Sequence, residues 1–146
     1  MAPFKLNTVL KHRQRLEDIA RNKFVEAKEM ADNVLKRRNS EKIRLLKLLE
    51  ERDKRQKEGI EITMLMRYEE MVARLETNLR GIEKNLQEKK KLVEQMHAGL
   101  LTHTKGRQAM EQLRDEQNRA WRKEIERKEA KMLDEIAVMR HNNEHY

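Results

Sequence analysis

The stretch LMRYEEMVARLETNLRGIEKNLQ, residues 65–87, decides the fold class of this chain. Its apolar residues recur in alternating steps of three and four, which is the heptad spacing of a coiled coil. The spacing continues to Met110, and eleven of its 14 positions are apolar when tyrosine is counted. We therefore predict a long helix that packs against another helix along one seam. The seam positions are Leu65, Tyr68, Val72, Leu75, Leu79, Ile82, Leu86, Lys89, Val93, Met96, Leu100, His103, Arg107 and Met110.

The composition supports an all-α chain without a central globular core. Charged residues make up 41% of the 146 residues, whereas aromatic residues make up only 3%. One proline and four glycines leave little material for turns. Such a balance, combined with helical periodicity, is typical of long helices and coiled coils. We expect a single domain that spans residues 1–146.

The first part of the chain carries a weaker seam of the same kind. Small alanines occupy several of its positions, and the charged residues Arg13, Glu17, Arg38, Glu41 and Arg52 interrupt it. Its apolar members are Leu6, Leu10, Ala20, Phe24, Ala27, Ala31, Val34, Leu45 and Leu48.

Gly59 lies between the two seams, and glycine readily adopts the left-handed conformation that ends a helix. The chain is therefore expected to form an antiparallel coiled-coil hairpin, with helix 1 at about 4–57, a turn near Gly59 and a longer helix 2 at about 61–141.

The unequal lengths of the two helices predict an overhang. Pairing should run out near residue 115, where the apolar spacing also slips to two steps of three at Arg107, Met110 and Leu113. The tail beyond would keep an apolar stripe that folds back, self-associates or binds another protein. That stripe contains Trp121, Ile125, Met132, Leu133, Ile136 and Met139. As an alternative, the glycines of GLLTHTKG (99–106) would break helix 2 and give three helices.

No catalytic site, metal site or cofactor is expected. His141, Glu144 and His145 match a zinc-peptidase pattern, but they lie at the very end of the chain, without a third ligand or a pocket. The phosphate-binding loop motif is absent from the sequence, and two helices make no dry cleft in which carboxylates could take different pKa values. We therefore expect a protein that is not an enzyme.

The net charge and the absence of a signal peptide and of a membrane-spanning stretch narrow the possible functions further. The formal net charge is +8, which suits an acidic partner. Nucleic acid is not expected, because acidic residues are interspersed among the basic ones and aromatic stacking residues are scarce. With no cysteine, no signal peptide and no apolar run of about 20 residues, we expect an intracellular chain without a membrane span.

Two features stand out as candidate partner contacts. Ile60, Met64 and Met71 would form an apolar patch at the hairpin tip, which either closes the end of the coiled coil or docks another protein. Trp121, the only tryptophan, is either a packing residue of the tail or an anchor for a partner.

Three segments together resemble the FliJ family of flagellar export proteins. They are FKLNTVLKHRQRLEDIARNKF (4–24), EGIEITMLMRYEEMVARLE (58–76) and WRKEIERKEAKMLDEIAVMR (121–140). The resemblance implies an antiparallel two-helix coiled coil in the bacterial cytoplasm, peripheral at the cytoplasmic face of the inner membrane through its partners. It also implies three partners within the flagellar type III export apparatus: the export ATPase ring, the cytoplasmic domain of the export gate, and export chaperones.

The resemblance also suggests which residues meet those partners. Tyr68, Met71 and Leu75 would join Ile60 and Met64 in contacting the export gate. The end that bears both termini would face the ATPase ring, through Arg13, Arg15, Arg21, Arg119, Trp121 and Arg122. The alternatives left open are a stalk of a virulence secretion system, a nucleic-acid-binding coiled coil, and a scaffold whose tail dimerises.

Overall fold

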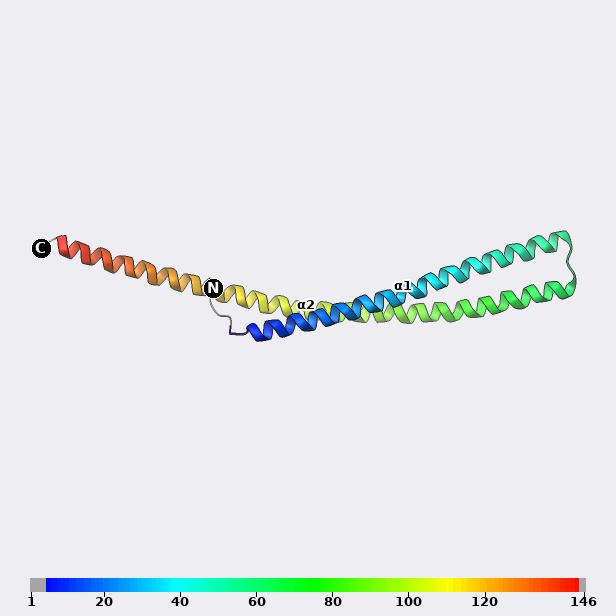
Figure 1. The fold of residues 1–146 in the computed structure, drawn as a ribbon, viewed down its shortest axis with the longest axis horizontal. Helices are drawn as coiled ribbons and strands as arrows, with labels where there is room; N and C mark the ends of the chain where they lie inside the picture. The colour runs from blue at the N-terminus through cyan, green and yellow to red at the C-terminus, as the bar shows by residue number, and fades with distance from the viewer. Residues whose placement is uncertain (1–4, 145–146) are drawn as a thin grey trace. The chain divides into compact units, whose positions relative to one another are not determined.

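The computed structural model describes residues 5–144, and they form two helices (Figure 1). Helix α1 is Asn7–Glu58, with 52 residues, and helix α2 is Ile62–Glu144, with 83 residues. No strand occurs in this described range. The all-α prediction of two long helices with a longer C-terminal one is confirmed. The start expected at residue 4 lies outside the described residues.

A short turn at Gly59 ends α1. Gly59 has a φ of 92°, a left-handed conformation that glycine adopts without steric penalty. Its N–H donates to the carbonyl oxygen of Gln56 at 3.3 Å, and so satisfies one of the acceptors left over at the helix end. Arg55 and Lys57 lie in the last turn of α1, where positive charge is favourable to the helix dipole.

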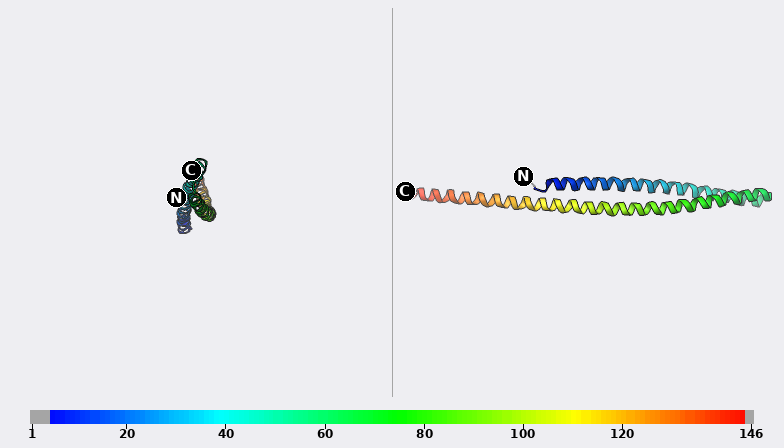
Figure 2. Two further views of the ribbon diagram at one scale, coloured as in Figure 1. Left: turned by 90° about the vertical axis from the view of Figure 1, so that its right-hand side faces the viewer. Right: turned by 90° about the horizontal axis from the view of Figure 1, so that it is seen from below.

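The chain divides into two compact units, which we describe separately. The first unit is Ile19–Leu101, in which α1 and α2 lie side by side on either side of the turn (Figures 1 and 2). A buried core cluster of this unit, formed by Leu48, Tyr68 and Val72, lies next to that turn. Leu45, Leu49, Ile60 and Leu75 pack around the cluster.

The seam positions predicted on α2 are the residues that α1 covers. All 14 positions from Leu65 to Met110 are buried or half-buried, and Leu86 is only 2% exposed. The period of the apolar pattern therefore identifies the packed face of α2 correctly.

Charged residues that interrupt the α1 seam find polar partners on α2. The Arg38 guanidinium lies 3.1 Å from Glu83, and the Arg52 guanidinium lies 3.0 Å from Glu69. These two pairs bridge the helices along the edge of the seam, whereas Nε of Arg38 is buried without a hydrogen-bond partner.

The second unit combines Met1–Asp18 with Thr102–Tyr146, and its seam is more polar. Glu17 is 5% exposed, and its carboxylate accepts a hydrogen bond from Nε of Arg107 at 2.7 Å. Arg107 also donates to Glu111 at 2.8 Å. The hydrogen bond with Glu17, followed by that with Glu111, raises the pKa of the Arg107 guanidinium above its ordinary value. Leu10 and Met110 supply the buried apolar contacts of this unit.

Helix α2 runs without a break through residues 99–106, so the three-helix alternative is wrong. A Cβ at Gly106 would lie 2.7 Å from a guanidinium nitrogen of Arg13, the far end of a flexible side chain that would have to shift. The helix cost of the two glycines, about 1 kcal/mol each, is small enough for contact with α1 to offset.

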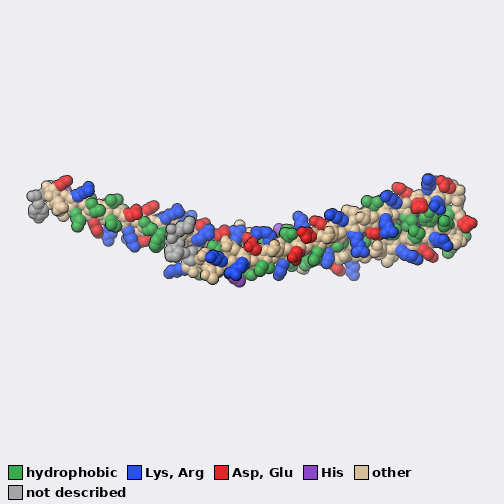
Figure 3. Space-filling model, viewed as in Figure 1, with side chains coloured by type: hydrophobic (Ala, Val, Ile, Leu, Met, Phe, Trp, Pro, Cys, Tyr) green, Lys and Arg blue, Asp and Glu red, His purple; other side chains and the backbone are tan. Residues whose placement is uncertain are grey.

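The end of α2 is exposed throughout. Every residue from 119 to 144 is exposed, because a helix of 52 residues cannot cover one of 83 residues. Figure 3 shows apolar side chains open on this segment, between basic and acidic ones. The predicted overhang is therefore present.

Candidate functional site

Three adjoining hollows follow the α1–α2 interface at the hairpin tip, and we call them together the tip groove. The hollow at the turn has a volume of about 600 Å³, the middle one about 220 Å³ and the third about 360 Å³. Met64 lines both the first and the middle hollow, and Met71 lines both the middle and the third. The methionines therefore join the three hollows into one surface.

Tyr68 lies in the middle of the tip groove and fixes its geometry. Its side chain is 7% exposed, and its hydroxyl donates to the Glu51 carboxylate at 3.0 Å. The Arg55 guanidinium lies 5.9 Å from the centre of the Tyr68 ring, within the range of a cation–π contact. Burial, followed by the hydrogen bond to Glu51, raises the pKa of Tyr68 above its ordinary value. The phenol thus stays neutral and anchors α2 to α1.

The most exposed apolar side chains in the groove are methionines. Met64 is 38% exposed and Met71 is 48% exposed, whereas Met66, on the same helix, is 60% exposed but lines none of the three hollows. Methionine is unbranched and polarizable, so it adapts to the shape of a contacting surface. Met64 and Met71 therefore present adaptable side chains at the surface of the groove.

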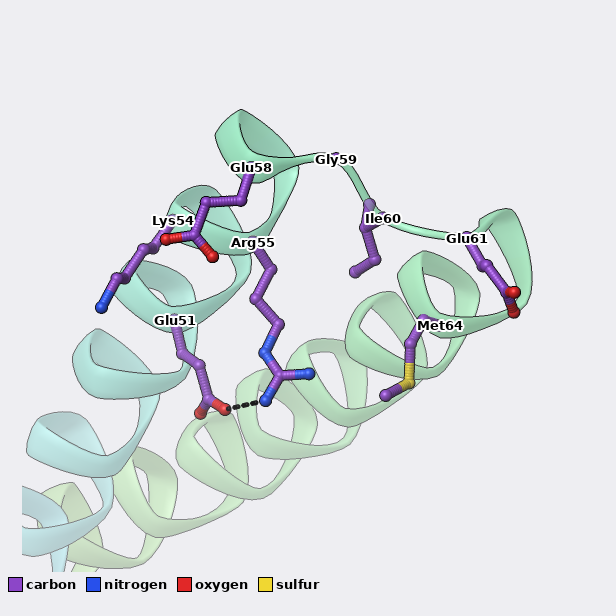
Figure 4. Close-up of a pocket in the computed structure, with 8 residues that line it drawn as sticks. All are labelled: Glu51, Lys54, Arg55, Glu58, Gly59, Ile60, Glu61 and Met64. Carbon is purple, nitrogen blue, oxygen red and sulfur yellow. Dashed lines mark ion pairs between the residues drawn. The ribbon is translucent and has the colours of Figure 1, made fainter.

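Charged residues surround the hollow at the turn (Figure 4). Arg55 extends from α1 toward the space below Ile60 and pairs with Glu51 at 3.7 Å. Glu58 and Glu61 lie on either side of Gly59, and the side chains of Ile60 and Met64 point into the hollow. The hollow is therefore lined mainly by charged side chains, with Ile60 and Met64 as its apolar members.

The structure brings all five residues predicted for the gate contact into the tip groove. Ile60 and Met64 line the hollow at the turn, Tyr68 lines the middle hollow, and Met71 and Leu75 line the third. Tyr68 and Leu75 also belong to the packed core of the tip, so they serve stability as well.

The six residues predicted for the ATPase contact do not form one cluster. Arg21 belongs to the unit Ile19–Leu101, whereas the other five belong to the second unit. Within that unit Arg13 lies against Gly106, thirteen positions before Arg119, which corresponds to about 20 Å along an α-helix. Arg119, Trp121 and Arg122 are all on the exposed end of α2, where Trp121 is 47% exposed.

Sequence reasoning missed the polar members of the tip groove. Glu51 and Arg55 are one turn apart on α1, but their roles depend on Tyr68, which is on the other helix. Once the turn is placed at Gly59, positions equally distant from it along the two helices face each other. That rule would have brought Glu51 close to Tyr68.

The described residues offer no site for a metal ion. No group of three or more His, Asp or Glu side chains in this range is placed to hold one, and His145 of the zinc-peptidase pattern lies outside it. Neither of the two helices, over the residues described, has a stretch apolar enough to span a bilayer.

Comparison with known proteins identifies the family. The sequence model of one family, described as the flagellar FliJ protein, matches residues 1–145. Neither a curated protein nor a solved structure matches the chain. A match over practically the whole sequence, together with the two-helix fold, leads to one conclusion. The chain belongs to the FliJ family and is a component of the flagellar protein export apparatus.

Proposed function

We propose that the chain is a non-enzymatic coupling component of flagellar export, whose tip groove docks the cytoplasmic domain of the export gate. The observation that carries this proposal is the clustering of Ile60, Met64, Tyr68, Met71 and Leu75 along one groove. Ile60, Met64 and Met71 form the apolar patch at the turn, and the family resemblance adds Tyr68 and Leu75 to them.

The groove combines tightly packed side chains with exposed ones, and this combination supports a docking role. Tyr68 is held by Glu51 and packed by Val72 and Leu48, so the floor is rigid. Met64 and Met71 project from that floor and are exposed. A rigid floor with adaptable exposed side chains lowers the entropic cost of binding, because few groups have to be ordered.

The gate contact is tested by charge insertion at the two methionines. In the variant Met64→Glu with Met71→Glu, we expect binding to the gate domain to weaken by about tenfold or more, measured by calorimetry. The helicity and the unfolding midpoint should change little, because both side chains are already exposed. Met66→Glu is the control, since Met66 is more exposed than either groove methionine but lines none of the three hollows. Equal binding by all three proteins would rule out the tip groove as the gate site.

The second half of the proposal concerns the export ATPase ring. Arg119, Trp121 and Arg122 lie together on the exposed end of α2, and they combine positive charge with an aromatic anchor. Arginine and tryptophan are the residue types enriched in binding hot spots. Rim charges would guide the orientation in which this end enters a ring of opposite charge.

Coupling needs no bond-making step by this protein. A component that binds one state of a ring more tightly than another shifts the ring toward that state. We expect Arg119→Ala with Trp121→Ala and Arg122→Ala to lose stimulation of the purified export ATPase while keeping gate binding. Loss of both activities together would instead indicate a general folding defect.

The remaining parts of the proposal follow from the family. The chain would assist the cycling of export chaperones and work at the cytoplasmic face of the inner membrane through its partners. Deletion of the gene should abolish or strongly reduce swimming. Normal motility, with no gate protein or ATPase recovered on the tagged chain, would overturn the proposed function.

A further inference from the structure

The exposed end of α2 carries an apolar stripe that no residue of the described chain buries. Its members are 37% to 66% exposed, and their spacings are four, seven, four and three residues. At 100° per residue they fall within about 60° of the helix circumference, so they form one face about 27 Å long. We call Trp121, Ile125, Met132, Ile136 and Met139 the tail stripe.

The spacing of the first four members of the tail stripe is palindromic. In a second copy laid antiparallel, Trp121 lies level with Ile136 and Ile125 lies level with Met132. Four of the five apolar residues of the stripe then meet an apolar residue, and Met139 lies level with Asn118. A parallel pair would also match apolar residues, because each would meet its own copy, so the apolar spacing alone does not choose the direction.

The charge distribution along the tail stripe favours the antiparallel direction. Residues 119–128 contain five basic and two acidic side chains, whereas residues 129–138 contain one basic and three acidic side chains. An antiparallel pair brings the basic half of one copy against the acidic half of the other, while a parallel pair places like against like. At the centre, the antiparallel pair gathers two copies of Lys128 and two of Glu129, a cluster with no net charge. Glu124 would also come within a turn of Lys131 from the second copy.

We propose that the exposed end of α2 binds a second copy of this chain, as an antiparallel two-fold dimer along the tail stripe. The same face of each copy is used, which closes the assembly at two chains. Only a few apolar layers are buried, so the dimer is weak and reversible. If the proposed function is right, the dimer also hides Trp121 from the ATPase ring. This consequence rests on the proposed function, whereas dimerisation itself does not.

Analytical ultracentrifugation of the purified full chain tests dimerisation without any export partner. Between about 5 and about 500 µM we expect the weight-average mass to rise from one chain toward two. Met132→Glu with Ile136→Glu should keep the chain monomeric over this range. Val138→Glu is the matched control, because Val138 is 58% exposed but lies on another side of the helix, and it should dimerise as the wild type does. A wild-type chain that stays monomeric throughout overturns the proposal.

The direction of the pair is tested by disulfide trapping, which is clean because the chain contains no cysteine. An equimolar mixture of Trp121→Cys and Ile136→Cys chains should form the mixed disulfide under mild oxidation. Each variant alone should form little disulfide-linked dimer, since the antiparallel arrangement holds identical positions about 22 Å apart along the helix. Efficient cross-linking of Trp121→Cys with itself would show a parallel pair and overturn the assignment.

Discussion

The covered and exposed parts of α2 belong to one helix and carry similar apolar patterns, yet their environments differ completely. Val72 and Leu86 in the covered part are 6% and 2% exposed, whereas Met132 and Leu133 in the exposed part are 61% and 67% exposed. The difference is set by the length of α1, which has 52 residues against 83 in α2. An apolar stripe therefore indicates that one face of a helix can be buried against another surface. The length of α1 determines how much of that face is buried within the chain itself.

The largest effect should come from removing a buried side chain of the covered part. Leu86→Ala leaves a cavity at the most buried position of the core, and we expect the free energy of unfolding to fall by about 2–3 kcal/mol. Met132→Ala in the exposed part should change it by less than about 0.5 kcal/mol. Urea unfolding followed by circular dichroism at low protein concentration measures both. Similar losses for the two variants would contradict the division of α2 into covered and exposed parts.

A smaller effect is expected from the polar layer between Glu17 and Arg107. Glu17→Ala removes the buried acceptor and leaves Arg107 with Glu111 alone, so we expect a loss of about 1–2 kcal/mol in unfolding free energy. Glu111→Ala removes the other partner of the same guanidinium. That pair joins half-buried neighbours one turn apart on the same helix, and it should contribute only a few tenths of a kcal/mol. If Glu17→Ala proved as mild as Glu111→Ala, the buried pair would not stabilise the seam.

Alanine substitutions at two glycines, one at the turn and one within α2, should change the stability of the hairpin in opposite directions. Gly59→Ala forces a left-handed conformation on alanine and should destabilise the hairpin by about 1 kcal/mol. Gly81→Ala, within α2 and with open space around its Cβ position, should stabilise it by up to about 1 kcal/mol. Thermal unfolding of the two variants should move the midpoint in opposite directions. A stabilising Gly59→Ala would show that the turn does not need the positive φ.

The smallest effect concerns a salt bridge on the exposed part. The hydrogen bond and the charge of Arg127 lower the pKa of the Glu124 carboxyl below its ordinary value. The local stabilisation is therefore present above the ordinary pKa and is lost as the pH falls through the lowered one. In an NMR titration, Arg127→Gln should return the pKa of Glu124 toward its ordinary value without moving the unfolding midpoint of the hairpin. A shifted midpoint would mean that this segment is part of the cooperative fold.

The sequence predicts the fold of this chain well because heptad spacing is a strong constraint over many turns. The seam from Leu65 to Met110, the two-helix architecture and the overhang all follow from period and length. The break considered at residues 99–106 does not occur, because helix propensity is a weak preference that contact with a second helix overrides. Gly106 lies beside Arg13, a contact that no local pattern reveals.

The candidate site was predicted in part, and the reason is again physical. The exposed positions of Met64 and Met71 follow from their place one residue before seam residues on a single helix. The contacts of Tyr68 with Glu51 and Arg55 join two helices, so they depend on the register of the hairpin. The pairing of Glu17 with Arg107 has the same origin, because each residue taken alone is only a polar interruption of its own seam.

Hydrogen exchange along α2 tests the central claim most directly. At a protein concentration low enough to keep the chain monomeric, amide protection should be high from Val72 to Met110 and should fall to near that of a fraying helix beyond residue 119. The protection should reappear in the exposed part as the concentration rises and the tail stripe pairs. Strong protection up to residue 144 in the monomer would contradict the account, because it would mean that this end already has a partner within the chain.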